Sequence, residues 1–235
     1  MKKGKKYIQA QEEFDTLELY SISESLELLK KIPHKKFDET VELHLVMGVN
    51  PKKANEMIRG TVVLPNGTGR DVTVLVFAKG DKADEAKEAG ADFVGMEDLA
   101  EKINGGWTNF DVAIATPNMM RFVGKLGRVL GPRKLMPNPK TGTVTLEVEK
   151  AVTEAKAGKV EYRVDKHANI HLPVGKISFD NDKLIENIGA AMAAILHDKP
   201  AASKGKYIKK MTICSTMSPG IRIDSPAYIK ELKAK

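Results

Sequence analysis

A two-residue alternation of apolar and polar side chains runs from Thr40 to Met47. This period is typical of a strand with one buried and one exposed face. The same alternation recurs over residues 160–164 and 170–174, on both sides of a polar turn, and predicts an antiparallel hairpin there. Another strand is predicted over residues 207–215. On the first strand Val41, Leu43, Leu45 and Met47 are expected to be buried, whereas Thr40, Glu42 and His44 form the polar face.

Two segments carry apolar residues three and four positions apart, which is the spacing of an amphipathic helix. The first follows a predicted capping box, Ser21 with Glu24, and ends at Pro33. The second covers residues 182–197 and ends before Pro200. Because neither flank of the chain has enough strands for a stable sheet, we expect both flanks to form one antiparallel sheet with these helices on one face.

The middle of the chain has a different pattern, in which apolar strands lack polar alternation and short helices lie between them. Strands buried on both faces and joined by helices are typical of a parallel sheet. The strands are predicted at residues 72–78, 92–94 and 111–116, and the helices at 82–89 and 98–103. The predicted fold class is α+β: a discontinuous domain with an antiparallel sheet and helices, residues 1–69 and 159–235, carries an inserted α/β domain of Rossmann-like topology, residues 70–158.

Charge separates the two predicted domains. The whole chain has 38 Lys and Arg residues against 31 Asp and Glu residues, a net charge of +7. From Asp71 to Ala157, 12 basic residues stand against 13 acidic ones, so the two flanks together carry a net charge of +8. Basic surfaces attract phosphates and release counterions on binding. The discontinuous domain is therefore the candidate binder of a polyanion.

Several functional classes lose support from the sequence. The strand at 72–78 is followed by Gly80 without a G-x-G-x-x-G motif, although a nucleotide- or cofactor-dependent enzyme that uses the α/β domain remains open as an alternative. No apolar run is long enough for a membrane span or a signal core, so we expect no membrane association. The single Cys214 cannot form an internal disulfide, which fits the cytoplasm. The five histidines show no metal-ligand spacing with Cys214, so we expect no metal and no cofactor.

The segment of residues 126–143 is the most distinctive of the chain. Its glycines and prolines prescribe successive turns, and Arg128, Arg133, Lys134 and Lys140 make it basic. A long solvated connection and an interaction loop are both compatible with this composition.

The same segment carries a resemblance to a known family. Residues 131–144, Gly-Pro-Arg-Lys-Leu-Met-Pro-Asn-Pro-Lys-Thr-Gly-Thr-Val, look like the signature of the ribosomal L-one family. Residues 36–42, 59–65, 89–92 and 215–217 match this family in order and spacing, so the resemblance covers about Tyr7 to Ile223. The signature positions are Gly131, Pro132, Arg133, Pro137, Asn138, Pro139, Lys140 and Gly142.

This resemblance implies a structural protein of the large ribosomal subunit, located in the cytoplasm, and not an enzyme. Members of the family bind a folded junction of large-subunit ribosomal RNA and form a mobile stalk beside the site where deacylated tRNA leaves. Many bacterial members also repress translation by binding the leader of their own messenger RNA. The implied partners are therefore large-subunit RNA, deacylated tRNA in the exit site and the messenger leader, with a monomeric free protein. Carried over by position, the residues implied to contact RNA are Lys36, Phe37, Thr40, Glu42, Lys166, His167, His171, Thr216, Met217 and Ser218.

The chemistry of these side chains suits RNA. Phe37 beside Lys36 can offer a flat apolar face next to a charge that attracts phosphate, although a core position for Phe37 is equally compatible with the sequence. The hydroxyl of Thr216 can donate to and accept from a ribose 2′-hydroxyl, and Met217 can pack against a ribose or a base. Ser218 stands where the family commonly has Gly, so we expect its side chain to alter the approach of RNA at this turn.

Overall fold

The computed structural model describes residues 4–32 and 36–234, so Pro33, the predicted end of the first helix, lies outside the described residues. The chain divides into two compact units. One is discontinuous and combines Met1–Gly69 with Val160–Lys235, and the other is the continuous segment Arg70–Lys159. Lys159 groups with the continuous unit, one residue beyond the boundary predicted from the sequence. Each unit has hydrophobic core residues of its own.

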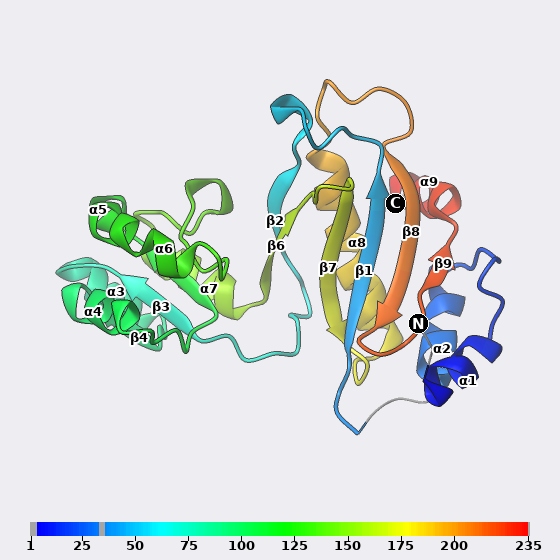
Figure 1. The fold of residues 1–235 in the computed structure, drawn as a ribbon, viewed down its shortest axis with the longest axis horizontal. Coiled ribbons are helices and arrows are strands. Elements are labelled where there is room, and N and C mark those ends of the chain that lie inside the picture. Colours follow the sequence, from blue (N-terminus) through cyan, green and yellow to red (C-terminus); the bar gives the residue numbers. More distant parts are fainter. Residues whose placement is uncertain (1–3, 33–35, 235) are drawn as a thin grey trace. The chain divides into compact units, whose positions relative to one another are not determined.

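A four-stranded antiparallel sheet forms the centre of the discontinuous unit, in the order β7-β1-β8-β9 (Figure 1). Its strands are β1 (Thr40–Met47), β7 (Asn169–Lys176), β8 (Ile208–Ser215) and β9 (Ile221–Ile223). Because β1 precedes the continuous unit in the chain and the other three strands follow it, the sheet joins the two flanks. β9 has no counterpart in the sequence prediction, since its three residues are too few to show an alternation.

Helices cover one face of this sheet. The inward positions of β1 are all buried, as the alternation predicts: Val41, Leu43, Leu45 and Met47. They share a core with residues of α2 (Ile22–Lys31) and α8 (Asn181–His197), two helices that pack against each other. α8 begins one residue before its predicted start and ends where predicted. α1 (Lys5–Glu12) and α9 (Ser225–Ala234) belong to the same unit.

The predicted capping box is present at the start of α2. The backbone amide of Glu24 donates to Oγ of Ser21 (3.3 Å), and the amide of Ser21 donates to Oε2 of Glu24 (2.9 Å). These bonds satisfy backbone donors that the start of a helix would otherwise leave unpaired. Leu26 and Leu29 then face the core, where both are fully buried.

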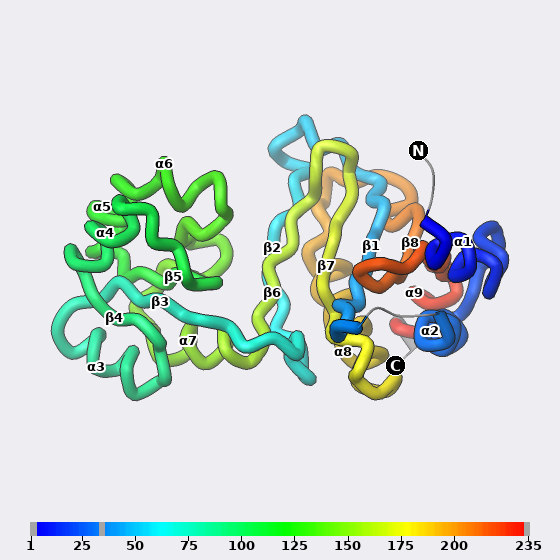
Figure 2. Tube along the Cα trace, turned by 60° about the horizontal axis from the view of Figure 1, so that its bottom comes forward, coloured from blue at the N-terminus to red at the C-terminus, as the bar shows by residue number. Residues whose placement is uncertain are grey.

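The predicted hairpin of residues 160–164 and 170–174 is wrong. β6 (Lys159–Arg163) pairs with β2 (Arg59–Val63) in a separate two-stranded sheet, whereas β7 pairs with β1. A turn still connects β6 with β7 (Figure 2), and in it the amide of Asp165 donates to the carbonyl of Asn169 (2.8 Å). Each strand has a partner of its own length elsewhere, and local alternation does not specify which partner a strand takes.

The continuous unit is built on a three-stranded parallel sheet in the order β4-β3-β5. All four residues of β3 are buried, and they alternate between two cores, one shared with α4 and the other with α3 and α7. The parallel pairing and the burial on both faces agree with the prediction for this segment. The elements are β3 (Val74–Phe77), α3 (Asp81–Glu88), β4 (Phe93–Gly95), α4 (Glu97–Asn104), β5 (Val112–Ala115) and α7 (Val148–Lys156).

Between β5 and α7 the chain forms short helical turns, and those within residues 126–143 agree with the successive turns that the glycines and prolines of that segment predict. These are η2 (Pro117–Met119), α5 (Met120–Val123), η3 (Gly124–Leu126), α6 (Gly127–Leu130) and η4 (Pro139–Thr141), and η1 (Ala54–Glu56) is a similar turn in the discontinuous unit. In the part of the chain that the structure describes, no helix is long and apolar enough to cross a membrane.

Candidate nucleic-acid interface

The second face of the four-stranded sheet carries polar side chains in facing rows. On β1, Thr40, Glu42 and His44 alternate with the buried residues and are partly exposed. Cys214 of β8 lies opposite Glu42, and His171 of β7 lies opposite His44. Side chains paired in this way have Cβ atoms about 4.5 to 5.5 Å apart. This open face therefore gathers predicted RNA contacts from adjacent strands.

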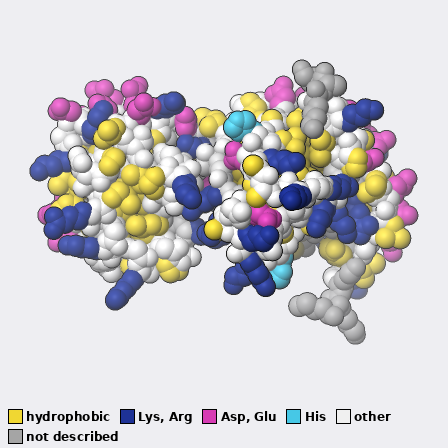
Figure 3. Space-filling model, turned by 90° about the horizontal axis from the view of Figure 1, so that it is seen from above, with side chains coloured by type: hydrophobic (Ala, Val, Ile, Leu, Met, Phe, Trp, Pro, Cys, Tyr) yellow, Lys and Arg dark blue, Asp and Glu magenta, His cyan; other side chains and the backbone are white. Residues whose placement is uncertain are grey.

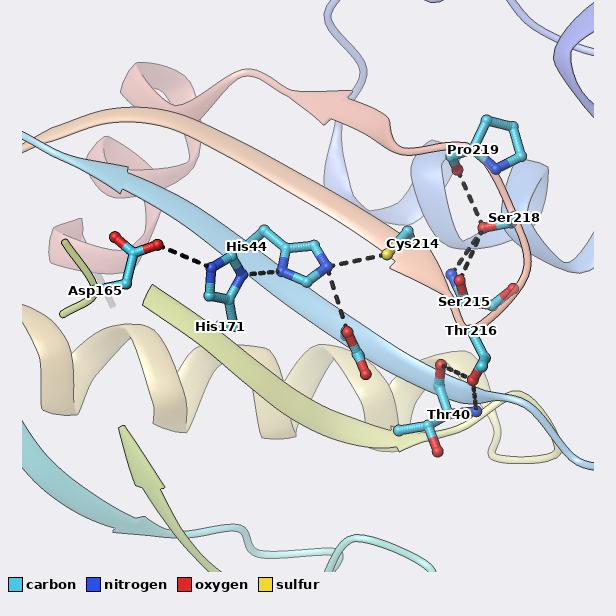
Figure 4. A network of polar contacts seen from close by, with 10 residues as sticks. Thr40, His44, Asp165, His171, Cys214, Ser215, Thr216, Ser218 and Pro219 are labelled. Atoms are coloured by element: carbon cyan, nitrogen blue, oxygen red, sulfur yellow. Dashed lines mark hydrogen bonds and ion pairs between the residues drawn. The ribbon is translucent and has the colours of Figure 1, made fainter. Parts of the chain in front are cut away.

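Thr40 and Thr216 join the end of β8 to the start of β1. The backbone amide of Thr40 donates to Oγ1 of Thr216 (3.0 Å), and this hydroxyl donates to the carbonyl of Thr40 at 3.4 Å (Figure 4). Nζ of Lys176, at the end of β7, donates to Oγ1 of Thr40 (3.0 Å). A hydroxyl has one donor and two acceptor positions, so these two bonds leave one acceptor position of Thr216 for a further donor.

Glu39, which the sequence prediction does not include, organises the turn that follows β8. Its side chain is buried, with 1% of the residue's surface exposed. Oε2 of Glu39 accepts hydrogen bonds from Oγ of Ser215 (2.5 Å) and from the backbone amide of Met217 (3.1 Å). A buried carboxylate needs such donors, and here they fix the backbone on both sides of Thr216. The sequence could have indicated this burial, because Glu39 stands two residues before Val41 and therefore points to the same inward face.

Ser218 uses its side chain inside the same turn. Its Oγ accepts from the backbone amide of Ser215 (2.8 Å) and donates to the carbonyl of Pro219 (3.1 Å). Its backbone amide donates to the carbonyl of Ser215 (3.2 Å). The residue that replaces the usual Gly of the family therefore stabilises the turn, and its side chain folds back onto the chain.

Two large apolar side chains are exposed beside this turn. Phe37 has 52% of its surface exposed and Met217 has 51%, so the alternative of a core position for Phe37 is wrong. Lys36, next to Phe37, is also exposed. The backbone of Met217 is bonded to Glu39, and Phe37 precedes Glu39 by two residues. Phe37 and Met217 therefore lie at the same end of the sheet.

Lys166 and His167 lie at the opposite end of the sheet. They belong to the turn between β6 and β7, whose Ala168 carbonyl accepts from the amide of Met47, the last residue of β1 (2.8 Å). At about 3.3 Å per residue, the two ends of this strand are roughly 23 Å apart. The predicted RNA contacts therefore form two groups along the sheet, with His171 between them, and not one compact patch.

Several lysines lie at the same end of the sheet as Lys166 and His167, and the sequence prediction of RNA contacts did not include them. Residues 199–210 contain five lysines and no carboxylate, and all five are exposed: Lys199, Lys204, Lys206, Lys209 and Lys210. The run leads into β8 next to the end of β1, where the amide of Gly48 donates to the carbonyl of Tyr207 (2.7 Å). In Figure 3, basic side chains gather over the middle of the discontinuous unit. In the sequence, five lysines without an intervening carboxylate could have indicated this basic surface.

A chain of polar contacts crosses the open face (Figure 4). Nε2 of His44 lies 3.1 Å from Sγ of Cys214, and Nδ1 of His44 lies 2.7 Å from Nδ1 of His171. Nε2 of His171 lies 3.6 Å from Oδ2 of Asp165. Burial, with a contribution from His171, lowers the pKa of His44, and burial raises the pKa of Cys214 to about 11. At neutral pH a thiol of Cys214 can therefore donate to Nε2 of a neutral His44.

The same region contains side chains that could hold a metal ion. Ligand atoms of Glu42, His44 and Cys214 lie within 4.8 Å of one another. The sequence argument against a metal site compared spacings along the chain, whereas His44 and Cys214 are 170 positions apart and meet through strand pairing. Spacing along the chain therefore does not decide whether this pair can bind a metal.

The signature segment has a structural role in the continuous unit. The side-chain oxygen of Asn138 accepts from the amide of Lys140 (2.8 Å), and the amide of Asn138 donates to Oγ1 of Thr143 (2.7 Å). Gly142 has a φ of +67°, a conformation that favours glycine. The carbonyl of Thr143 accepts from the amide of Ala115 in β5 (2.9 Å). The segment is therefore ordered against the sheet and is not a freely solvated connection.

The remaining signature positions differ in exposure. Pro137 is buried, whereas Gly131, Pro132, Arg133, Pro139 and Lys140 are exposed. The guanidinium of Arg133 donates to Oγ1 of Thr108. Arg133 and Lys140 therefore lie on the surface of the continuous unit.

The start of α3 is unsuited to binding a phosphate. In a Rossmann-like domain that binds a dinucleotide, the helix after the first strand places its N-terminus at the pyrophosphate. Here that helix has Asp81 and Asp84 in its first turn. Their charges would repel a phosphate from the position that the helix dipole otherwise favours. Together with the missing glycine motif, this argues against the alternative of a nucleotide-dependent enzyme.

Comparison with known proteins confirms the resemblance over nearly the whole chain. The ribosomal protein L1p/L10e family matches residues 28–219, which include β1, the continuous unit and β8. "Large ribosomal subunit protein uL1" of Solibacter usitatus (strain Ellin6076) is 58% identical over 228 residues, which cover 97% of this chain and 96% of that protein. Members of this family are structural ribosomal proteins and not enzymes. On both findings, the chain belongs to the ribosomal protein L1p/L10e family and is a protein of the bacterial type.

Proposed function

We propose that this protein binds ribosomal RNA as a structural component of the large subunit of the cytoplasmic ribosome. The name of its relative in Solibacter usitatus, a large ribosomal subunit protein, supports this assignment. The net charge of +7 suits a polyanionic partner. On this proposal, residues 1–69 and 159–235 form a discontinuous RNA-binding domain, and residues 70–158 form an inserted Rossmann-like domain.

The observation that carries the proposal is the 3.0 Å hydrogen bond between Thr40 and Thr216. It brings the two flanks of the chain to one end of the sheet, where Phe37 and Met217 expose apolar surface and Lys36 adds positive charge. RNA is often recognised through stacked bases and ribose hydroxyls. Phe37 and Met217 would pack against bases or riboses, and the free acceptor position of Thr216 would bind a 2′-hydroxyl.

The opposite end of the sheet would contact phosphates. Lys166 and His167 lie there, together with the exposed lysines of residues 199–210. Phosphate contacts position a protein on RNA and supply affinity without reading the sequence. Between the two ends, His171 and Glu42 would contact the RNA, because a carboxylate can accept from ribose hydroxyls and base amino groups.

The stalk functions of the family are part of this proposal. We infer that the protein forms the mobile stalk beside the tRNA exit site and takes part in the release of deacylated tRNA. A messenger leader that imitates the ribosomal junction would bind the same surface, so that the monomeric free protein represses its own translation. The use of one surface for both RNAs is what makes these roles testable together.

Footprinting tests the proposal directly. The purified protein should protect a folded junction of large-subunit RNA from hydroxyl-radical cleavage, and titration should give saturable binding in the presence of excess unrelated duplex RNA. A protein that leaves the junction unprotected but binds a nucleotide saturably would support the enzyme alternative instead.

A further inference from the structure

Three side chains with metal-binding atoms converge on the open face of the sheet. Oε2 of Glu42 lies 3.5 Å from Nε2 of His44, and Sγ of Cys214 lies 3.1 Å from the same nitrogen. One ligand atom of each residue lies within 4.8 Å of the other two. Donor atoms on one tetrahedral zinc ion are roughly 3.3 to 3.6 Å apart, given bonds of about 2.0 to 2.3 Å. Small side-chain rotations therefore suffice to place all three donors on one ion.

Strand pairing holds these residues in position. Glu42 and Cys214 are direct partners on β1 and β8, and His44 follows Glu42 by two residues on the same face. Both strands have a neighbour on each side in the four-stranded sheet. A site on interior strands is held more precisely than a site on loops.

A second layer of contacts orients His44. Its Nδ1 lies 2.7 Å from Nδ1 of His171, and Nε2 of His171 lies 3.6 Å from Oδ2 of Asp165. The carboxylate of Asp165 also accepts from two backbone amides of its own turn, at 2.8 and 2.7 Å. When the proton of His44 is on Nδ1, the lone pair is on Nε2, the ring nitrogen that lies next to Glu42 and Cys214 and can bind the ion. Histidines that bind metals commonly use the second ring nitrogen in this way, which fixes the tautomer and the ring orientation.

We propose that Glu42, His44 and Cys214 bind a divalent transition-metal ion of the zinc class. All three residues are only partly buried, so a water molecule can complete the coordination from the solvent side. A thiolate, an imidazole and a carboxylate together favour zinc or cobalt over magnesium and calcium, which prefer oxygen ligands. The ion replaces the thiol proton of Cys214, and this proton passes to the solvent.

Titration of the full-length, untagged protein with cobalt(II) in the absence of RNA tests this site. Coordination by a thiolate produces a sulfur-to-cobalt charge-transfer band, which zinc should remove by displacement. We expect the band at one ion per chain. Cys214→Ser should abolish it, and His44→Ala should weaken zinc binding further than His171→Ala, whose loss of an outer contact should cost roughly 10- to 100-fold in affinity.

His197→Ala is the matched control. His197 also lies beside a carboxylate, with 3.4 Å between its Nδ1 and Oδ1 of Asp198, but on the last residue of α8 and not on the open face. This variant should bind cobalt and zinc like the wild type. Thermal unfolding of the metal-free variants separates the loss of a ligand from the loss of the fold.

Two outcomes would overturn the site: a folded wild-type protein that shows no charge-transfer band with cobalt(II), or unchanged zinc affinity in folded Cys214→Ser and His44→Ala variants. The first outcome needs no variant, so the site remains testable even where a substitution prevents folding. Because the measurement contains no RNA, its failure leaves the proposed RNA binding untouched.

Discussion

The buried carboxylate of Glu39 accepts a hydrogen bond from the backbone amide of Met217, 178 positions further along the chain, at 3.1 Å. The same oxygen accepts from Oγ of Ser215. One acidic side chain thus connects the entry to β1 with the turn after β8. The exposed Met217 belongs to this connection and the exposed Phe37 precedes Glu39 by two residues, so the proposed recognition surface depends on a residue that RNA itself would not touch.

Replacing Glu39 with Ala should lower both the free energy of unfolding and the affinity for junction RNA, because two donors lose their buried acceptor. An unsatisfied buried donor costs on the order of 1 to 3 kcal/mol. Glu39→Gln keeps the shape and one acceptor oxygen and should therefore lose less of both. Denaturant unfolding and RNA titration measure the two effects. An Ala variant as stable as the wild type would show that the carboxylate does not hold the turn.

Thr216→Ala should weaken binding to the junction RNA by removing a ribose contact. A loss on the order of 1 to 3 kcal/mol corresponds to roughly 5- to 150-fold in affinity. Part of this loss would come from the bonds between Thr216 and the backbone of Thr40. Met217→Ala should act in the same direction without disturbing those bonds, and both variants should weaken a messenger leader in parallel.

The control for these two variants is Lys150→Ala, an exposed position in the continuous unit, which should change little. Binding is measured by titration, with thermal unfolding to verify the fold. Wild-type affinity in both the Thr216 and the Met217 variants would remove this surface from the mechanism.

Deleting Arg70–Lys159 and joining the flanks with a short Gly/Ser linker should leave a folded protein that still binds the junction RNA. The predicted contacts lie in the flanks, which keep 24 basic and 18 acidic residues, a net charge of +6, once Arg70–Lys159 is removed. The exposed basic residues between β5 and α7 should contribute little to affinity. If the deletion variant unfolds cooperatively but no longer binds, the division of roles between the two units is wrong.

Affinity should fall steeply with salt while selectivity for the junction persists. With roughly 4 to 8 phosphates engaged, the logarithm of the binding constant should fall against the logarithm of salt concentration with a slope of about −3 to −7. Selectivity should remain because it comes from shape and local contacts. Titrations at several salt concentrations, with an unrelated RNA in parallel, measure both quantities, and a nearly flat slope would contradict the role given to the lysines.

The sequence by itself determined the elements whose signal is local. The alternation from Thr40 to Met47 specified the buried face of β1, and the pair of Ser21 and Glu24 specified the start of α2. The apolar run over β3 specified a strand buried on both faces. Each of these depends on residues close together in the chain, where side-chain periodicity and backbone geometry are directly linked. The signature at residues 131–144 identified the family in the same way, through one continuous segment.

Only the tertiary structure decided which strands pair and which distant side chains meet. β6 and β7 follow each other through one turn, yet they take partners in different sheets. His44 meets Cys214 and Glu39 meets Met217 across 170 and 178 positions of sequence, and neither contact has a local signature. The physical reason is that the choice of strand partner depends on burial and backbone hydrogen bonding summed over the whole sheet. The alternation of apolar and polar residues within one strand indicates which face of that strand is buried, but it does not indicate which strand lies beside it.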